Sequence, residues 1–399
     1  MNVVIVGAGQ AGGWVARTLR DRAFQGKVTL LGAEALPPYE RPSLSKHLLS
    51  GKESAPSFVL NAAELDAGAV EFRGNRLVTR ILPKSKCVEC ADGLQLTYDK
   101  LVLTMGGRAR IPAIPGINLP GVYSLRTVQD SADISSHIAP NKKMLVIGGG
   151  WIGLEVAATA QTKGMQVTVV EMGERLCARS IPAEISNFLL QKHVSAGVSI
   201  RFNVSIDEIR KEGASLIAHI GDDRLSADVI VVGVGLIPNA EIAVEAGLEV
   251  DNGIVVDERG RTSETHIYAA GDITNHPNNW AGKHIRLESW ANAQNQGIAV
   301  GRVLAGDEFH YDEIPWFWSD QYEVNLQVIG IPHPRATNVL RGSVGDSAFT
   351  VFQFLEERLE AVIAINNSRD IKIAKSWMKA GKYPPRSALA DVNLRLDRL

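Results

Sequence analysis

The sequence is poor in cysteine and contains no long hydrophobic run. Three cysteines among 399 residues cannot build a disulfide framework, so we expect a protein of a reducing compartment, the cytoplasm. The longest apolar stretch, residues 229–238, is interrupted by Gly233 and Gly235 and is too short to span a bilayer as a helix. The first residues already read as a buried strand, which leaves no room for a cationic signal segment. We therefore expect neither secretion nor a membrane anchor.

An excess of charge of one sign is also missing. The 42 lysines and arginines and the 44 aspartates and glutamates give a net charge of −2. We therefore expect no broad surface for nucleic acid, and any charged docking site must be a local patch. His276 and His284 lack further residues at ligand spacing, so we expect no metal site. The length favours two or three domains.

A glycine-rich turn follows the first strand. The apolar run at residues 3–6 leads into Gly7, Gly9 and Gly12, and then into a helical stretch at residues 14–22. In this pattern the first glycine makes a tight turn, the second lets the backbone approach a pyrophosphate, and the third lets the helix pack on the strand. A second strand, residues 27–31, ends shortly before Glu34, whose carboxylate can bind ribose hydroxyls.

The same unit recurs in the middle of the chain. A strand at residues 143–147 leads into Gly148, Gly150 and Gly153, followed by a helix at about residues 154–163. The next strand, residues 166–170, ends at Glu171. Two such units predict two bound dinucleotides. Because hydride transfer requires their rings to meet, we expect the two domains to face each other.

Further strands at residues 100–104, 228–232 and 265–270 suggest where the chain passes between domains. We expect it to enter the second domain after Gly107 and to return after Gly235. The predicted fold class is α/β, with two nested Rossmann-like domains and a C-terminal α+β domain. That last domain follows from predicted strands at 349–354 and 358–364 and a helix at 370–380. The expected boundaries are 1–109 and 239–313 for the first domain, 110–238 for the second and 314–399 for the third.

Cys87 and Cys90 have the C-x-x-C spacing of a redox or metal motif. Their context predicts instead a β-hairpin over residues 86–98, with its turn at 91–93. Side chains three apart on a strand point to opposite faces, so the two thiols would diverge. We expect neither a dithiol couple nor a metal site here.

Four longer runs carry a family resemblance: residues 38–46 (PYERPSLSK), 148–157 (GGGWIGLEVA), 235–239 (GLIPN) and 315–322 (PWFWSDQY). Together they resemble the FAD-dependent ferredoxin reductases of Rieske oxygenase and cytochrome P450 electron-transfer systems. The resemblance implies a glutathione-reductase-like fold in which the first domain binds FAD and the second binds NAD.

The resemblance also implies site residues. For FAD these are Gly7, Gly9, Ala11, Gly12, Glu34, Arg41, Lys46, Val78, Arg126, Gly271, Asp272 and Trp290. For NAD they are Gly148, Gly150, Ile152, Gly153, Glu171 and Gly235. Trp290 would begin a helix, capped by Ser289, whose N-terminus points at the flavin pyrimidine. One departure is Ala33, which stands where the family usually has an acid, so the ribose contact is expected to shift to Glu34 or to weaken.

The catalytic residues implied by the resemblance are Lys46, Glu155 and Trp318. Lys46 would lie beside flavin N5 and stabilise negative charge, Glu155 would pair with Lys46, and Trp318 would cover the flavin near the electron exit. The expected reaction is hydride transfer from NADH to the flavin, followed by single-electron transfer to an iron–sulfur protein. Glu171 favours NADH because a carboxylate repels a 2′-phosphate. Arg175 is close enough in sequence to pair with such a phosphate, but we expect it to contact solvent or another part of the site instead.

The expected partner is a [2Fe–2S] ferredoxin, with a Rieske-type protein and a weak homodimer left open. The ferredoxin would supply an oxygenase, with an aromatic-ring dioxygenase as the expected type. Lys372, Lys375 and Lys379 share one face of the last predicted helix and could attract an acidic ferredoxin, although such a face is often only solvated. Two alternatives are a rubredoxin reductase and a non-catalytic flavoprotein scaffold that senses NADH.

Overall fold

The computed structural model describes residues 1–66 and 68–399. The chain divides into two compact units, each assembled from three separate segments. Unit 1 comprises Met1–Arg41, Pro56–Arg108 and Leu236–Pro315; unit 2 comprises Pro42–Ala55, Ala109–Gly235 and Trp316–Leu399. The short segment Pro42–Ala55, which lies within the range expected for the first domain, therefore belongs to unit 2.

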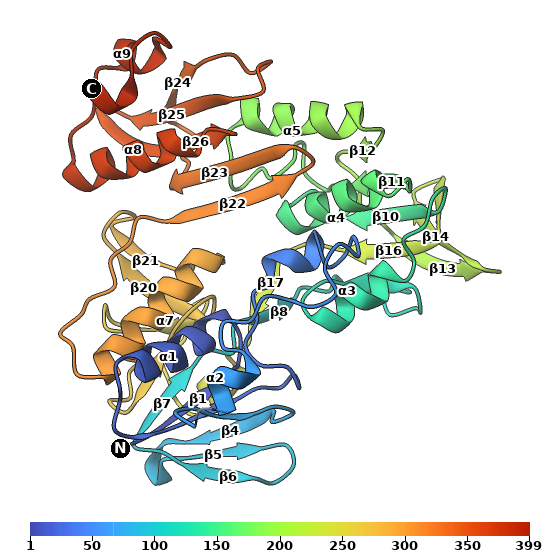
Figure 1. The fold of residues 1–399 in the computed structure, drawn as a ribbon. Coiled ribbons are helices and arrows are strands. Elements are labelled where there is room, and N and C mark those ends of the chain that lie inside the picture. Colours follow the sequence, from blue (N-terminus) through green and yellow to red (C-terminus); the bar gives the residue numbers. More distant parts are fainter. Residues whose placement is uncertain (67) are drawn as a thin grey trace. The chain divides into compact units, whose positions relative to one another are not determined.

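Unit 1 is built on a five-stranded parallel sheet in the order β19-β7-β1-β2-β3. The central strand β1 (Asn2–Val6) is apolar and buried after its first residue, as a strand covered on both faces requires. Helices α1 and α7 pack closely beside each other (Figure 1), because Gly297 of α7 lies against the backbone of Ala11. The parallel strands and principal helices are α1 (Gln10–Asp21), β2 (Lys27–Leu31), β3 (Glu71–Arg73), β7 (Lys100–Leu103), β19 (Ile267–Ala269) and α7 (Trp290–Leu304).

Smaller elements complete unit 1. The antiparallel sheet β4-β5-β6 contains the predicted hairpin around residues 91–93, which is confirmed. The remaining elements are α2 (Ala62–Asp66), β4 (Val78–Leu82), η2 (Pro83–Ser85), β5 (Cys87–Cys90), β6 (Gln95–Thr97), β17 (Leu236–Pro238), α6 (Glu241–Glu245), β18 (Ile254–Val255), β20 (Thr274–Asn278) and β21 (Lys283–Ile285). Strand β17 pairs with β8 (Gly107–Ala109). At β8 the chain passes from unit 1 into the long segment Ala109–Gly235 of unit 2.

Unit 2 contains a second five-stranded parallel sheet, in the order β12-β11-β10-β16-β9. A three-stranded antiparallel sheet, β13-β14-β15, accompanies it. The elements are η1 (Pro42–Ser45), β9 (Val122–Ser124), α3 (Val128–Ser135), β10 (Lys143–Ile147), α4 (Trp151–Thr162), β11 (Gln166–Val170), α5 (Ala183–Ser195), β12 (Ser199–Arg201), β13 (Glu208–Glu212), β14 (Ser215–Ile220), β15 (Asp223–Ala227) and β16 (Val229–Val232).

The last part of unit 2 is an antiparallel sheet in the order β22-β23-β26-β25-β24, with α8 on one side (Figure 1). The predicted strands at 349–354 and 358–364 and the helix at 370–380 are confirmed. The elements are β22 (Trp316–Gln321), β23 (Val324–Gly330), β24 (Thr337–Arg341), β25 (Phe349–Leu355), β26 (Arg358–Ile365), α8 (Ser368–Ala380), α9 (Arg386–Ala390) and η3 (Leu396–Arg398).

The predicted fold class is thus correct, with two parallel-sheet nucleotide folds and a C-terminal α+β part. Two predicted helix starts were wrong. Helix α1 begins at Gln10 rather than Trp14, and α4 begins at Trp151 rather than Leu154. In each case the third glycine of the motif lies inside the first turn of the helix, because only that placement lets the helix pack directly on the preceding strand.

Candidate functional site

The glycine turn of unit 1 leaves the N-terminus of α1 open. Gly7 has a φ of +105°, and a Cβ there would lie 2.5 Å from the carbonyl oxygen of Thr104. A Cβ on Gly12 would lie 2.0 Å from the carbonyl oxygen of Gly7. At Gly9, by contrast, a Cβ would meet nothing within 4 Å. Gly7 and Gly12 are therefore required for packing, whereas Gly9 keeps space free in front of the unpaired N–H groups of the helix.

Two further predicted residues of unit 1 are held close to this turn. Gly271 has a φ of +88°, and a Cβ there would lie 2.9 Å from the Cβ of Ala11. Its N–H donates to Oε1 of the buried Gln296, at 2.7 Å. The adjacent Asp272 accepts at its backbone carbonyl from Arg286. Gln296 was missed in the sequence, because nothing in an α-helical glutamine signals that it anchors a distant turn.

Glu34 and Arg41, both predicted at the same site, bind each other. Arg41 Nη2 donates to Glu34 Oε1 at 2.9 Å, and the hydroxyl of Tyr39 donates to Glu34 Oε2 at 2.6 Å. The Arg41 guanidinium also lies over the ring of Tyr39. The carboxylate that follows Ala33 is therefore oriented by two donors, and its remaining lone pairs can still accept from a ribose.

The remaining residues predicted to contact FAD are Trp290, Val78 and Arg126. Trp290 is the first residue of α7, and Ser289 caps that helix by accepting from the N–H of Asn292, as predicted. Burial raises the pKa of the nearby Glu40 carboxyl, an effect that a hydrogen bond from Trp290 partly offsets. Val78 is buried in an apolar cluster with Val6 and Leu31. Arg126 lies in unit 2, immediately before the capping box of α3.

The glycine turn of unit 2 has the same construction. A Cβ on Gly153 would lie 2.1 Å from the carbonyl oxygen of Gly148, whereas a Cβ on Gly150 would come no nearer than 3.8 Å to any atom. Ile152, in the first turn of α4, is 45% exposed, which is unusual for a large apolar side chain. Gly235 is exposed with a φ of +122°, and a Cβ there would lie 4.0 Å from the guanidinium nitrogens of Arg110 and Arg179.

Glu171 directly follows β11, and its carboxylate binds backbone N–H groups at the second glycine turn. Its Oε2 accepts from the N–H of Gly149 at 2.7 Å, and its Oε1 accepts from the N–H of Gly173 at 2.7 Å. Arg175 is committed elsewhere, because its guanidinium donates to the carbonyls of Ile181 and Ala178 and to the hydroxyl of Ser186. The cation that could have paired with a phosphate thus holds the following loop together.

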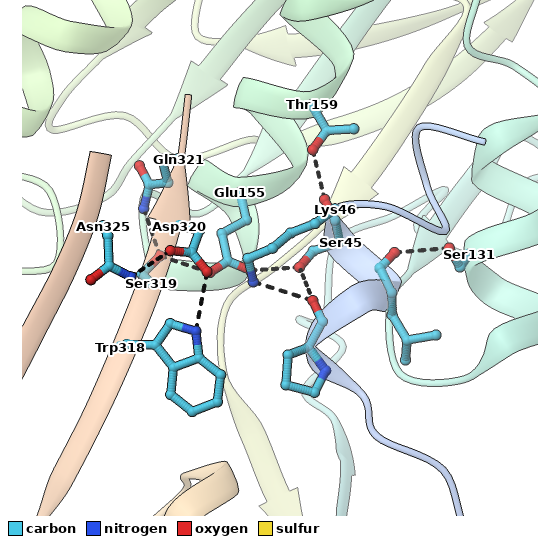
Figure 2. A network of polar contacts seen from close by, with 12 residues as sticks. Ser45, Lys46, Ser131, Glu155, Thr159, Trp318, Ser319, Asp320, Gln321 and Asn325 are labelled. Carbon is cyan, nitrogen blue, oxygen red and sulfur yellow. Dashed lines mark hydrogen bonds and ion pairs between the residues drawn. The ribbon is translucent and has the colours of Figure 1, made fainter. Parts of the chain in front are cut away.

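The predicted pair of Lys46 and Glu155 is present in unit 2 (Figure 2). Lys46 Nζ lies 2.7 Å from Glu155 Oε2 and 3.2 Å from the carbonyl oxygen of Pro42. Glu155 projects from α4 and is 4% exposed. The hydroxyl of Ser45 donates to Glu155 Oε2 at 2.5 Å, and that of Ser319 donates to Oε1 at 2.7 Å. Neither serine was predicted, because a serine in a turn or a strand carries no signal of its own.

Trp318 lies on the opposite face of β22 from Ser319. Its indole stacks on that of Trp316, with ring centroids 5.2 Å apart, and its Nε1 donates to Asp320 Oδ2 at 3.1 Å. Asp320 in turn accepts from Asn325 at 2.6 Å. Figure 2 shows the indole joined to the Asp320 carboxylate by this hydrogen bond, which fixes its orientation.

The three cysteines are free and buried. Burial raises the pKa of the Cys90 thiol and, more strongly, that of Cys177. Among the described residues, no group of histidines, cysteines and carboxylates could hold a metal ion. No described helix is both long and apolar enough to cross a membrane. On α8, Lys372 and Lys379 are exposed.

Comparison with known proteins matches residues 1–297 to the family described as pyridine nucleotide-disulphide oxidoreductase, and residues 316–399 to the family described as reductase C-terminal. Rhodocoxin reductase of Rhodococcus erythropolis is 39% identical over 402 residues, which cover 99% of this chain and 94% of the relative. The ferredoxin–NAD(+) reductase component of the anthranilate 1,2-dioxygenase system of Burkholderia cepacia is 39% identical, over 98% of both chains.

Solved structures of ferredoxin reductases are also similar to this chain. The ferredoxin reductase for the CYP199A2 system of Rhodopseudomonas palustris is 36% identical, with a TM-score of 0.95 over 100% of this chain and 99% of the other. The covalent complex of putidaredoxin reductase with putidaredoxin is 34% identical to this chain and gives a TM-score of 0.94, over 100% of this chain and 97% of the other.

Proposed function

This chain belongs to the pyridine nucleotide-disulphide oxidoreductase family, and from that premise we propose that it passes electrons from NADH, through FAD, to a [2Fe–2S] ferredoxin that supplies an oxygenase. It is an oxidoreductase whose cofactors are FAD and NADH. The observation that carries the proposal is the pair of open helix N-termini, α1 and α4. A glycine precedes each helix, and the space that a side chain would fill at that glycine is free.

The residues fit these cofactors. In unit 1 we assign the FAD diphosphate to Gly7, Gly9, Ala11 and Gly12, with Glu34, Arg41, Gly271, Asp272 and Trp290 as further contacts and Val78 as a lining residue. Arg126, which the family resemblance also assigns to FAD, belongs to unit 2. In unit 2 we assign NADH to Gly148, Gly150, Ile152, Gly153, Glu171 and Gly235. By the family resemblance, Lys46 belongs beside N5 of the flavin ring. When bound, FAD can accept two electrons as a hydride and release them one at a time.

The protein then contributes charge and orientation. Lys46 offers a cation to negative charge on the ring, and Glu155 fixes the position of that cation. The buried cysteines leave no exposed thiol for a dithiol mechanism. We propose a cytoplasmic location on the same ground, since unpaired cysteines are typical of reducing compartments.

The acceptor is assigned from the relatives, which are named for dioxygenase and cytochrome systems. The finer proposals are that the oxygenase is an aromatic-ring dioxygenase and that the ferredoxin is of Rieske type. The Lys372, Lys375 and Lys379 face of α8 is the proposed docking patch. If it attracts an acidic ferredoxin, the rate of ferredoxin reduction must fall as salt is added.

The direct test is NADH-driven cytochrome c reduction by the purified protein, alone, with a [2Fe–2S] ferredoxin and with a rubredoxin. We expect strong dependence on the ferredoxin. Dependence on rubredoxin would instead identify a rubredoxin reductase. If neither carrier accelerates cytochrome c reduction and NADH reduces the flavin slowly, the protein would instead be a non-catalytic flavoprotein scaffold that senses NADH. Sedimentation velocity on the same preparation tests for a weak homodimer.

The first prediction concerns nicotinamide choice. Glu171→Arg is expected to lower kcat/KM for NADH at least about tenfold and to raise that for NADPH, because the carboxylate that would repel a 2′-phosphate becomes a cation. Steady-state kinetics with both nucleotides measure this. Glu171→Gln is the control, since it removes the charge but keeps a hydrogen-bond acceptor. Equal use of NADPH and NADH by the unmodified protein would contradict the assignment.

The second prediction concerns electron exit. Trp318→Ala is expected to slow ferredoxin reduction about tenfold while changing flavin reduction by NADH less than about twofold, because the stacked indole is proposed to lie on the exit side. Stopped-flow measurement of the two half-reactions separates them. Trp316→Ala, which removes only the stacking neighbour, is the matched control. Equal slowing of both half-reactions by Trp318→Ala would remove it from the exit route.

A further inference from the structure

The polar network around Glu155 continues well beyond Lys46. Ser319 Oγ, which donates to Glu155, accepts from Gln321 Nε2 at 3.0 Å. Gln321 Oε1 lies 2.9 Å from His193 Nε2, and His193 Nδ1 lies 3.1 Å from the hydroxyl of Tyr322. An unbroken chain of hydrogen bonds therefore joins Tyr322 to the carboxylate that holds Lys46.

This chain is built into the core of unit 2. Ser319 and Gln321 are two residues apart on β22, so both side chains point to the same face of the strand. His193 comes from α5 and is completely buried, at 0% exposure. Gln321 and Ser319 are 3% and 1% exposed. Water cannot readily substitute for any of these partners, so each depends on the next.

The direction of every hydrogen bond follows from the carboxylate at the end. Glu155 can only accept, so the single proton of the Ser319 hydroxyl is committed to it. Ser319 must then accept from Gln321, which turns the amide nitrogen toward Ser319 and the amide oxygen toward His193. That oxygen also only accepts, so His193 must carry its proton on Nε2 and accept at Nδ1 from Tyr322.

The state of His193 fits this arrangement. Burial lowers the pKa of its imidazole, so the neutral ring, with one donor and one acceptor, is favoured. Burial raises the pKa of the Tyr322 hydroxyl, which therefore keeps the proton that it donates. All donors in the chain consequently point toward Glu155.

We propose that His193 is a positioning residue for flavin reduction: through Gln321 and Ser319 it fixes the orientation of the Glu155 carboxylate and hence the place of the Lys46 ammonium. This inference rests on the proposed function, since it assigns Lys46 to the flavin. His193 itself touches neither cofactor in this account. Its effect is transmitted through three side chains.

A double-mutant cycle on the FAD-loaded protein tests the proposal. His193→Phe keeps an aromatic ring but removes both hydrogen bonds. It is expected to slow flavin reduction by NADH about fivefold and to shift the flavin midpoint potential, whereas in a Glu155→Gln background the additional slowing should stay below about twofold. A loss of similar size in both backgrounds would show a merely structural role and overturn the proposal.

Two further variants keep the test decisive. His193→Gln can still donate to Gln321 and accept from Tyr322, so it is expected to restore the rate to within about twofold of the unmodified protein. His137→Phe is the matched control, because His137 also pairs with a tyrosine in unit 2, Tyr123 at 3.0 Å, in a pair with no described link to Glu155. If His137→Phe and His193→Phe had equal effects, the inference would fail.

Nitrogen NMR of the His193 ring gives a readout independent of turnover. We expect the Nε2–H tautomer in the unmodified protein. In Glu155→Gln either amide atom can face Ser319, so the Nδ1–H tautomer should become populated. If Glu155→Gln left the tautomer of His193 unchanged, the two residues would not be coupled and the proposal would be overturned. A colourless protein, or a flavin that NADH does not reduce, would refute the proposed function instead.

Discussion

Gly150→Val is expected to raise the KM for NADH at least about a hundredfold while leaving the yellow colour of bound FAD unchanged. The backbone at Gly150 is extended, with φ of −87°, so valine fits it without strain. The nearest atom to a Cβ there is 3.8 Å away, so folding is undisturbed and the branched side chain fills only the space in front of α4. Steady-state turnover at varied NADH concentration, with a [2Fe–2S] ferredoxin as acceptor, measures the loss.

Gly9→Val is the reciprocal variant and the control. Its backbone is likewise extended, with φ of −89°, and nothing lies within 4 Å of a Cβ there. We expect this protein to lose FAD, measured as flavin absorbance per chain, while unfolding at nearly the same temperature as the unmodified protein. If each variant impaired both cofactors equally, the assignment of one nucleotide to each unit would be wrong.

The second large effect is expected from Lys46→Met. It should slow flavin reduction by NADH at least about tenfold, because the ring loses its neighbouring cation. It should also lower the free energy of unfolding by about 2 kcal/mol, since the carboxylate of Glu155 stays buried without its ion partner. Stopped-flow absorbance and urea unfolding measure the two losses.

The double variant Lys46→Met/Glu155→Gln separates these causes. Its neutral amide removes the unpaired charge, so stability should recover while the rate stays low. Recovery of the rate together with stability would mean that Lys46 acts only by holding the fold. A normal rate in Lys46→Met alone would exclude any part for this lysine in flavin reduction.

The architecture was largely predictable because its signals are local. Uninterrupted apolar runs, such as residues 3–6 and 144–147, identify buried parallel sheets without reference to distant residues. The glycines are equally informative, because Gly7 and Gly12 occupy positions where a Cβ would collide with backbone. The helix starts were wrong because the sequence does not show whether the third glycine precedes the helix or lies within it.

The site was predictable mainly where the family resemblance points to a residue. Lys46 and Glu155 were predicted in this way, and the ion pair between them is present. Ser45, Ser319, Gln321 and His193 gave no such signal, because each is an ordinary residue whose role comes from neighbours more than a hundred positions away. Arg175 was expected to contact solvent or another part of the site rather than a phosphate, and its guanidinium indeed donates to loop carbonyls.

Strand β22 has a consequence for how such reductases can be recombined. It lies in the segment 316–399, which matches a family of its own, yet it supplies Ser319 to a carboxylate of the nucleotide-binding part. A chimaera that exchanged this C-terminal segment to change the acceptor would therefore also replace a residue that holds Glu155. If Glu155 and Lys46 act as proposed, electron entry and electron delivery would then be inherited together rather than as independent modules.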